Sequence, residues 1–158
     1  MAFGRPSLKA RALRLLSQRE HSCSELAAKL AKHICADDPA DGTAEIARVV
    51  DELSKLGFVS DQRTADSVLH AKGQRYGPLK IRQVLQSKGI APDLISSAVD
   101  KARSTELDTA RQLWERRFGV AATDPKERAR QYRFLTGRGF SPGTIRRLLS
   151  ITHAPPAD

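Results

Sequence analysis

Aromatic side chains are scarce in this sequence of 158 residues, at 5% of the chain, and no run of 18 apolar residues occurs. The first scarcity argues against one large aromatic-rich core, and the second argues against a membrane span. The opening residues 1–6 lack the apolar stretch of a secretory signal. Two cysteines are too few for a disulfide framework, so we expect a soluble protein of the reducing cytoplasm.

The alternation of apolar and polar residues that marks strands is also missing, whereas apolar residues recur at helical spacing, as at Leu26 and Leu30. Capping residues separate the helical stretches. Ser22 and Glu25 form a capping box, and Thr43 is the expected cap of a later helix. The pattern predicts nine helices of roughly 9–15 residues.

A short frame, Leu-x-x-x-Gly followed by Phe or Ile, occurs three times, at residues 53–61, 85–93 and 135–143. Each copy predicts a helix that ends at a glycine, with the next apolar residue folded back onto the last turn. A second echo relates residues 21–30 to residues 76–85. We therefore predict an all-α fold, an elongated and curved array of three tandem three-helix modules, spanning residues 8–56, 60–103 and 105–151.

The sequence lacks a phosphate-binding glycine loop and any local signature of a Ser-His-Asp or Cys-His nucleophile. Its nearest approach to a zinc site is the pair His21-Ser-Cys23 and His33-Ile-Cys35. A helix between the two cysteines would hold them roughly 18 Å apart, too far for a shared zinc ion. An apparent calcium loop from Asp37 has Arg48 where the bidentate glutamate belongs. We expect no enzymatic activity, no cofactor and no metal site.

Positive charge is abundant and unevenly distributed. The chain has 27 Lys and Arg against 18 Asp and Glu, a net charge of +9. Residues 111–147 hold ten cations and three acids, whereas residues 37–52 hold six acids and one cation. Arginine predominates among the cations, and its planar guanidinium matches phosphate and carboxylate groups. The charge therefore indicates a polyanion, or an acidic protein surface, as the partner.

Residues 57–63 (GFVSDQR) and 75–90 (RYGPLKIRQVLQSKGI) resemble the central signature of the RecX family of bacterial recombination regulators. Residues 12–26 and 134–140 resemble the family's N-terminal and C-terminal motifs. Two features depart from the family pattern. Thr64 stands where an aromatic residue is usual, which we expect to weaken packing at the start of the second module, and the loop at residues 35–43 is longer than usual.

The resemblance implies a protein without catalytic chemistry that binds the RecA–DNA filament. Such a protein inhibits the recombinase, ATPase and coprotease activities of RecA by blocking filament extension or promoting disassembly. We expect a monomer that contacts RecA and, weakly and without sequence preference, DNA phosphates. The alternative is a stand-alone DNA-binding helical regulator, which would show strong sequence preference. The candidate contact residues are all basic: Arg75, Lys80, Arg82, Lys88, Arg128, Arg130, Arg133 and Arg138.

Overall fold

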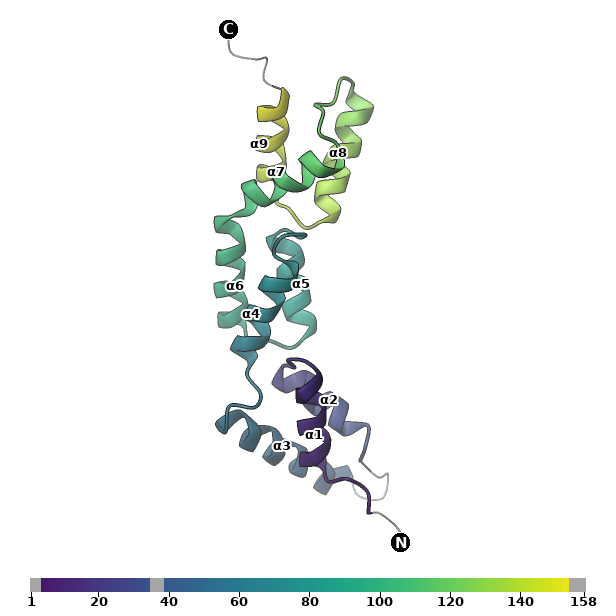
Figure 1. Ribbon diagram of the computed structural model, residues 1–158, viewed down its shortest axis with the longest axis vertical. Coiled ribbons are helices and arrows are strands. Elements are labelled where there is room, and N and C mark those ends of the chain that lie inside the picture. The colour runs from purple at the N-terminus through teal and green to yellow at the C-terminus, as the bar shows by residue number, and fades with distance from the viewer. Residues whose placement is uncertain (1–3, 35–38, 154–158) are drawn as a thin grey trace. The chain divides into compact units, whose positions relative to one another are not determined.

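A computed structural model describes residues 4–34 and 39–153, and these residues form nine α-helices and no strand (Figure 1). No helix among them has both the length and the apolar character needed to cross a membrane. The all-α prediction is confirmed. The helices are α1 (Leu8–Gln18), α2 (Cys23–Ala31), α3 (Pro39–Lys55), α4 (Asp61–Lys72), α5 (Pro78–Ser87), α6 (Pro92–Ser104), α7 (Glu106–Arg117), α8 (Pro125–Gly137) and α9 (Pro142–His153).

Of the two capping predictions, the one for Ser22 and Glu25 is confirmed and the one for Thr43 is not. Ser22 and Glu25 form the complete capping box, in which the Ser22 hydroxyl accepts from the backbone N–H of Glu25 and the Glu25 carboxylate accepts from the N–H of Ser22. The carboxylate of Asp124 caps α8 by accepting from the backbone N–H of Glu127. The prediction for Thr43 was wrong, because α3 already begins at Pro39. Proline suits a first turn, since its missing N–H has no helical acceptor there.

The three predicted glycine turns all form. Gly57, Gly89 and Gly139 have φ values of 81°, 69° and 85°, in the left-handed region that glycine tolerates without strain. Their places in the fold differ, however. The second and third turns connect α5 to α6 and α8 to α9, whereas the first connects α3 to α4 and so joins two triplets of helices. The sequence frame therefore marks helix ends, and only two of its copies occupy equivalent places.

The apolar residue after each glycine was expected to pack against the preceding turn. Ile90 and Phe140 are buried, with 5% and 1% of their surface exposed. Phe58 contradicts the expectation, because it is 52% exposed and Val59 is buried in its place. The first turn thus leaves its aromatic ring in solvent.

The described chain divides into two compact units, which we call unit 1 (residues 1–67 and 86–94) and unit 2 (residues 68–85 and 95–158). Each unit is considered by itself. In unit 1, α1, α2 and α3 pack on one another around a core that includes Leu26, Leu30 and Leu53. In unit 2, α7, α8 and α9 pack around Trp114, Leu135, Phe140 and their neighbours.

The helices α4, α5 and α6 each bury an apolar face at helical spacing. Ile81 and Leu85 of α5 are fully buried, and Val99 and Ala98 of α6 are buried with 1% and 3% of their surface exposed. Thr64 of α4 is also buried, at 2% exposure, and its hydroxyl oxygen has no hydrogen-bond partner among the described residues. A buried hydroxyl without a partner destabilises the folded state, so Thr64 carries a penalty at this position.

In unit 1, the start of α2 docks on the turn between α5 and α6. The hydroxyl of Ser22 donates to the carbonyl of Lys88 at 2.5 Å, and the hydroxyl of Ser24 donates to the carbonyl of Gly89 at 3.4 Å. A Cβ atom on Gly89 would lie 2.6 Å from Oγ of Ser24, closer than real contacts allow. The glycine therefore permits both the turn and the docking.

In unit 2, the start of α5 docks on the turn between α8 and α9 in a corresponding way. The backbone N–H of Gly77 donates to the carbonyl of Arg138 at 2.7 Å, and the N–H of Leu79 donates to the carbonyl of Gly139 at 3.0 Å. The sequence echo aligns Ser22 with Gly77 and therefore Ser24 with Leu79. Two repeated sequence patterns thus meet at each docking contact: the helix start at residues 21–30 or 76–85, and the glycine turn at residues 85–93 or 135–143. The contact occurs once in each unit.

Candidate anion-binding surface

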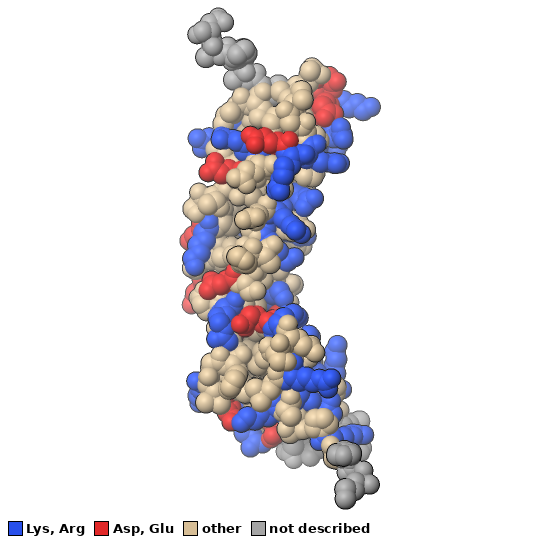
Figure 2. Space-filling view, viewed as in Figure 1, with Lys and Arg blue, Asp and Glu red and all other residues tan. Residues whose placement is uncertain are grey.

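The net positive charge of the chain belongs to unit 2. Its sequence ranges hold 16 Lys and Arg against 7 Asp and Glu, a surplus of nine. Unit 1 holds 11 of each kind and has no net charge. In Figure 2, blue side chains gather on the side of unit 2 where Figure 1 places α5 and α8. The electrostatic attraction that the net charge exerts on an anion therefore originates in unit 2.

Cations in unit 1 are largely neutralised by neighbouring carboxylates. Arg63 pairs with Glu20 at 3.1 Å, and Lys9 pairs with Glu52 at 2.6 Å. Exposed pairs of this kind add little stability, but they reduce the local field. Unit 1 therefore offers a mixed surface to a polyanion.

Several cations of unit 2 instead stack on aromatic rings. The Arg138 guanidinium lies 5.5 Å from the ring centre of Tyr76 and 5.2 Å from that of Phe134. The Arg117 guanidinium in turn lies 5.8 Å from Phe134 and 6.0 Å from Phe118. These distances are within the range of cation–π attraction. Arginine and aromatic side chains thus alternate across the surface.

This alternating row continues at both ends. Lys72 lies 5.5 Å from the ring centre of Tyr76, and Arg130 lies 5.6 Å from that of Phe118. The rings of Phe118 and Phe134 meet edge to face at 5.4 Å. We call the row the cation–aromatic ladder: Lys72, Tyr76, Arg138, Phe134, Arg117, Phe118 and Arg130. Because its cations are held by rings, they lose less side-chain entropy when an anion binds.

An open pocket lies at one end of the ladder. It is lined by Arg117, Phe118, Glu127, Arg130 and the loop that precedes α8. Arg130 is also 3.3 Å from the carboxylate of Glu127, so its charge is partly compensated. The pocket therefore presents Arg117 more freely than Arg130.

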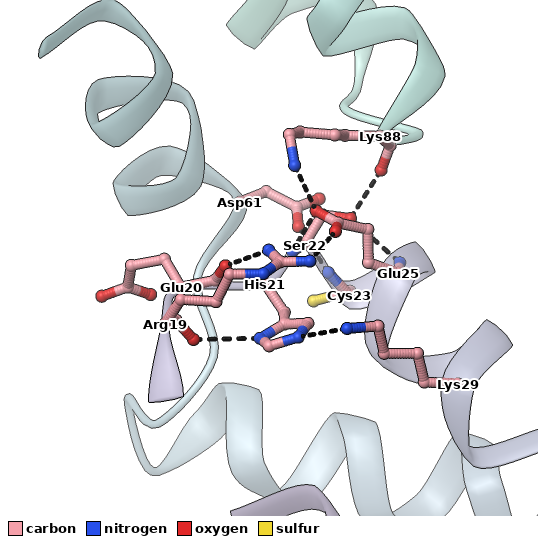
Figure 3. Close-up of polar contacts among 9 residues, drawn as sticks. All are labelled: Arg19, Glu20, His21, Ser22, Cys23, Glu25, Lys29, Asp61 and Lys88. Carbon is pink, nitrogen blue, oxygen red and sulfur yellow. Dashed lines mark hydrogen bonds and ion pairs between the residues drawn. The ribbon is translucent and has the colours of Figure 1, made fainter. Parts of the chain in front are cut away.

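Lys88 is placed differently from the other candidate contact residues, because it belongs to unit 1. Its ammonium pairs with the carboxylate of Glu25 at 3.1 Å, while its carbonyl accepts from Ser22 (Figure 3). Only 23% of its side chain is exposed. Lys88 therefore helps to hold α2 on the turn between α5 and α6.

The same Glu25 carboxylate also accepts from Arg19 at 2.9 Å and from the backbone N–H of Ser22. Burial by itself raises the pKa of Glu25, but the hydrogen bonds from Arg19, Lys88 and Ser22 together lower it below its ordinary value. The carboxylate is thus held ionised between two cations.

The remaining seven candidates all lie in unit 2. Arg138 and Arg130 belong to the ladder. Lys80 is half-buried. A Cβ atom added at Gly139 would lie 2.5 Å from Cβ of Lys80, so the Lys80 side chain lies at the α5 docking contact. Arg82 is half-buried on α5. Arg75, Arg128 and Arg133 are exposed, as is Arg130.

Two members of the ladder, Arg130 and Arg138, are among the candidate contact residues, and the other five are not. Arg117 was counted in the basic segment at residues 111–147 but not singled out, and Phe118 and Phe134 were not proposed as contact residues. Both phenylalanines are half-buried at the edge of the core of α7, α8 and α9. The available signal was the run Arg116-Arg117-Phe118, which places a cation next to a ring at the end of a helix.

The residues of the apparent zinc site are engaged in other contacts where the structure describes them. Burial and the neighbouring Asp61 carboxylate raise the pKa of the Cys23 thiol, so the sulfur stays protonated and is a poor metal ligand at neutral pH. Nδ1 of His33 lies 3.2 Å from the guanidinium of Arg11. Cys35 and Asp37 lie outside the described residues. Within those residues, no three metal-ligating side chains converge.

Family models match three successive stretches of the chain. Residues 9–53 match the first three-helix domain of RecX, residues 60–99 the second, and residues 104–149 the third. The matched stretches correspond to α1–α3, α4–α6 and α7–α9. The prediction of three tandem three-helix domains is confirmed.

Curated relatives match over nearly the whole length. The regulatory protein RecX of Leptothrix cholodnii is 50% identical over 153 residues, which cover 96% of this chain and 94% of that protein. The regulatory protein RecX of Ralstonia nicotianae is 38% identical over 90% of this chain and 86% of its own. A crystal structure of RecX from Lactobacillus salivarius aligns with a TM-score of 0.72 at 20% identity, covering 92% of this chain and 94% of that one. That structure shares the fold.

Proposed function

We propose, from the premise that this chain belongs to the RecX family of regulatory proteins, that unit 2 carries its contact with the RecA–DNA filament. The chain is a regulator of RecA and not an enzyme. Its effect is to inhibit the recombinase, ATPase and coprotease activities by blocking filament extension or promoting disassembly. No bond is made or broken by the chain itself.

The observation that carries this proposal is the confinement of the net charge to unit 2, together with the cation–aromatic ladder there. A filament on DNA presents phosphates and acidic protein side chains in a repeating pattern. Arginine binds both groups through its planar fork of N–H donors. A row of arginines fixed by aromatic rings offers several such forks in a set order.

The candidate residues divide into two roles in this proposal. Arg75, Arg82, Arg128 and Arg133 contact the filament directly, and Arg130 and Arg138 contact it as members of the ladder. Lys80 and Lys88 act mainly by positioning, because their side chains lie at the two docking contacts. Phosphate contacts of this kind are sequence-independent and weaken as salt increases. We further propose that the chain acts as a monomer in the cytoplasm.

ATP hydrolysis by RecA on single-stranded DNA tests the proposal. The chain, added in amounts below those of RecA, should lower the hydrolysis rate. Co-sedimentation should then recover it with RecA filaments more efficiently than with bare DNA. Unchanged hydrolysis at equal amounts of the two proteins would contradict the proposal.

A matched pair of double variants tests the location of the contact. Arg128→Glu with Arg133→Glu reverses two exposed charges of α8 in unit 2, and we expect at least a tenfold loss of inhibitory potency. Arg14→Glu with Lys32→Glu makes the same change in net charge on exposed residues of unit 1 and should change potency less than twofold. Equal losses in both variants would show that total charge matters and that α8 is not the contact surface.

A further inference from the structure

His21 is a buried histidine with a cation on one side of its ring. It lies between the end of α1 and the start of α2, and only 1% of its surface is exposed. Its Nδ1 atom is 2.9 Å from the backbone carbonyl of Arg19, and its Nε2 atom is 3.0 Å from Nζ of Lys29 (Figure 3). Both ring nitrogens therefore have partners.

The chemistry of these partners fixes the protonation state of the ring. A carbonyl oxygen only accepts hydrogen bonds, so Nδ1 must carry the proton and donate to Arg19. An ammonium only donates, so Nε2 must be unprotonated and accept from Lys29. The arrangement is satisfied by one neutral tautomer and by no charged form. A proton added at Nε2 would direct an N–H bond at the ammonium of Lys29.

The charges that face the ring come from the two helices that flank it. Arg19 at the end of α1 and Lys29 on α2 are cations, and Glu25 on α2 is an anion that is already shared between Arg19 and Lys88. Burial is the largest cause that lowers the pKa of His21, and the charges of Arg19 and Lys29 add to it. The hydrogen bond to the Arg19 carbonyl and the charge of Glu25 oppose this shift only in part.

The position of His21 connects its protonation to the docking of α2. The next residue, Ser22, caps α2 and donates to the carbonyl of Lys88. In the corresponding contact of unit 2, the sequence echo aligns His21 with Tyr76, a ring that stacks on Arg138. Tyrosine does not titrate near neutral pH, so the two docking contacts differ in their response to protons.

We propose that His21 is a proton-sensitive latch, which holds α2 on the turn between α5 and α6 when the ring is neutral and loosens that contact when the ring is protonated. The contact in unit 2 has no such latch. The proposal concerns the fold of unit 1 and does not depend on the proposed function.

Nitrogen NMR of the full-length chain tests the latch without any substitution. At pH 7.5 the His21 ring should show protonated Nδ1 and unprotonated Nε2, and it should titrate below the ordinary imidazole value of 6.5. As His21 titrates, the amide of Ser22 and those of the turn at Lys88 and Gly89 should shift with the same midpoint. The other neutral tautomer, or a midpoint at or above 6.5, would overturn the proposal.

Two variants add a test by stability. Lys29→Met removes the facing ammonium and should raise the titration midpoint of His21 by at least half a pH unit. His21→Gln keeps an amide that can donate to Arg19 and accept from Lys29 but does not titrate. Because a lowered pKa means that the folded state binds fewer protons than the unfolded state, wild-type stability should fall as the pH drops below about 6.5.

The glutamine variant should lose that part of the pH dependence between pH 7 and 5, whereas His70→Gln, an exposed control on α4, should keep it. If the glutamine variant fails to fold, the titration midpoint of His21 in the Lys29→Met variant tests the proposal by itself. An unchanged midpoint there, or equal pH dependence in all variants, would overturn the latch.

Discussion

Gly139 and Lys80 lie so close together that a Cβ atom on the glycine would stand 2.5 Å from Cβ of the lysine. Gly139 also has a φ of +85°, so it is constrained by its backbone and by its neighbour. This pair marks the place where α5 docks on the turn between α8 and α9. The glycines of the chain allow these two constraints to be measured separately.

Three alanine substitutions separate the cost of the left-handed backbone from the cost of the close contact with Lys80. Gly139→Ala should lower the free energy of unfolding by about 2–5 kcal/mol, because it adds a clash to a left-handed backbone. Gly57 has the same left-handed backbone, but a Cβ atom added there would have no other atom within 4 Å. Gly57→Ala should therefore lower the free energy of unfolding by only about 1–2 kcal/mol. Gly143→Ala has neither constraint and should stabilise α9 slightly. Urea denaturation measures all three, and equal losses at Gly139 and Gly57 would show that the close contact with Lys80 is absent.

Thr64 provides an opportunity to stabilise the chain. Thr64→Val keeps the branched shape and removes the buried hydroxyl that has no partner among the described residues. We expect a gain of about 1 kcal/mol in the free energy of unfolding. Thr136→Val, at an exposed position of α8, should change stability by less than about 0.5 kcal/mol. A loss of stability in the Thr64 variant would show that the hydroxyl has a partner in solution.

Trp114 depends on Gln131 inside the core of α7, α8 and α9. The indole N–H donates to Oε1 of Gln131 at 2.8 Å, and the amide of Gln131 donates to the carbonyl of Val120 at 3.1 Å. Gln131→Leu leaves the indole and this carbonyl without partners, which should cost about 1–3 kcal/mol. The fluorescence of Trp114, the single tryptophan, reports unfolding directly. An exposed control, Gln112→Leu, should leave stability nearly unchanged, and an equal loss there would contradict this assignment.

The carboxylate of Glu25 should make folding sensitive to acid. Its pKa is lower in the folded state than the ordinary value of 4.5, so its contribution is fully present above about pH 4.5. That contribution is lost as the pH falls through the lowered pKa. Glu25→Gln should therefore cost about 1.5–3 kcal/mol at pH 7 and flatten the decline in stability between pH 5 and 3. Glu115→Gln, exposed on α7, should keep the decline, and an unchanged slope in the Glu25 variant would refute this role.

The local features of the fold could be predicted from the sequence because they depend on a few adjacent residues. A capping box needs only Ser22 and Glu25, and a glycine turn needs only the end of one helix. Even here the start of α3 was placed too late, since a helix can begin at Pro39 as well as after Thr43. The exposure of Phe58 was missed because burial depends on what packs nearby, which the local frame does not contain.

The docking contacts could not be predicted, although both partners were visible as sequence echoes. Ser22 and Lys88 are 66 residues apart, and nothing local relates a cap to a distant carbonyl. The ladder was missed for a similar reason. The attraction between Arg138 and Tyr76 requires that two separate helix ends meet. The excess of positive charge was plain from composition, but its confinement to one unit depends on how the chain divides.

The docking of α5 is made by main-chain atoms: two N–H groups on one side and two carbonyls on the other. Such a contact places demands on backbone shape and almost none on side-chain chemistry. The side chains around it are consequently available for other purposes, and Arg138 serves in the ladder while its own carbonyl anchors a helix. Substitutions could therefore reverse or remove the charge of this surface without breaking the docking of α5 on the turn between α8 and α9.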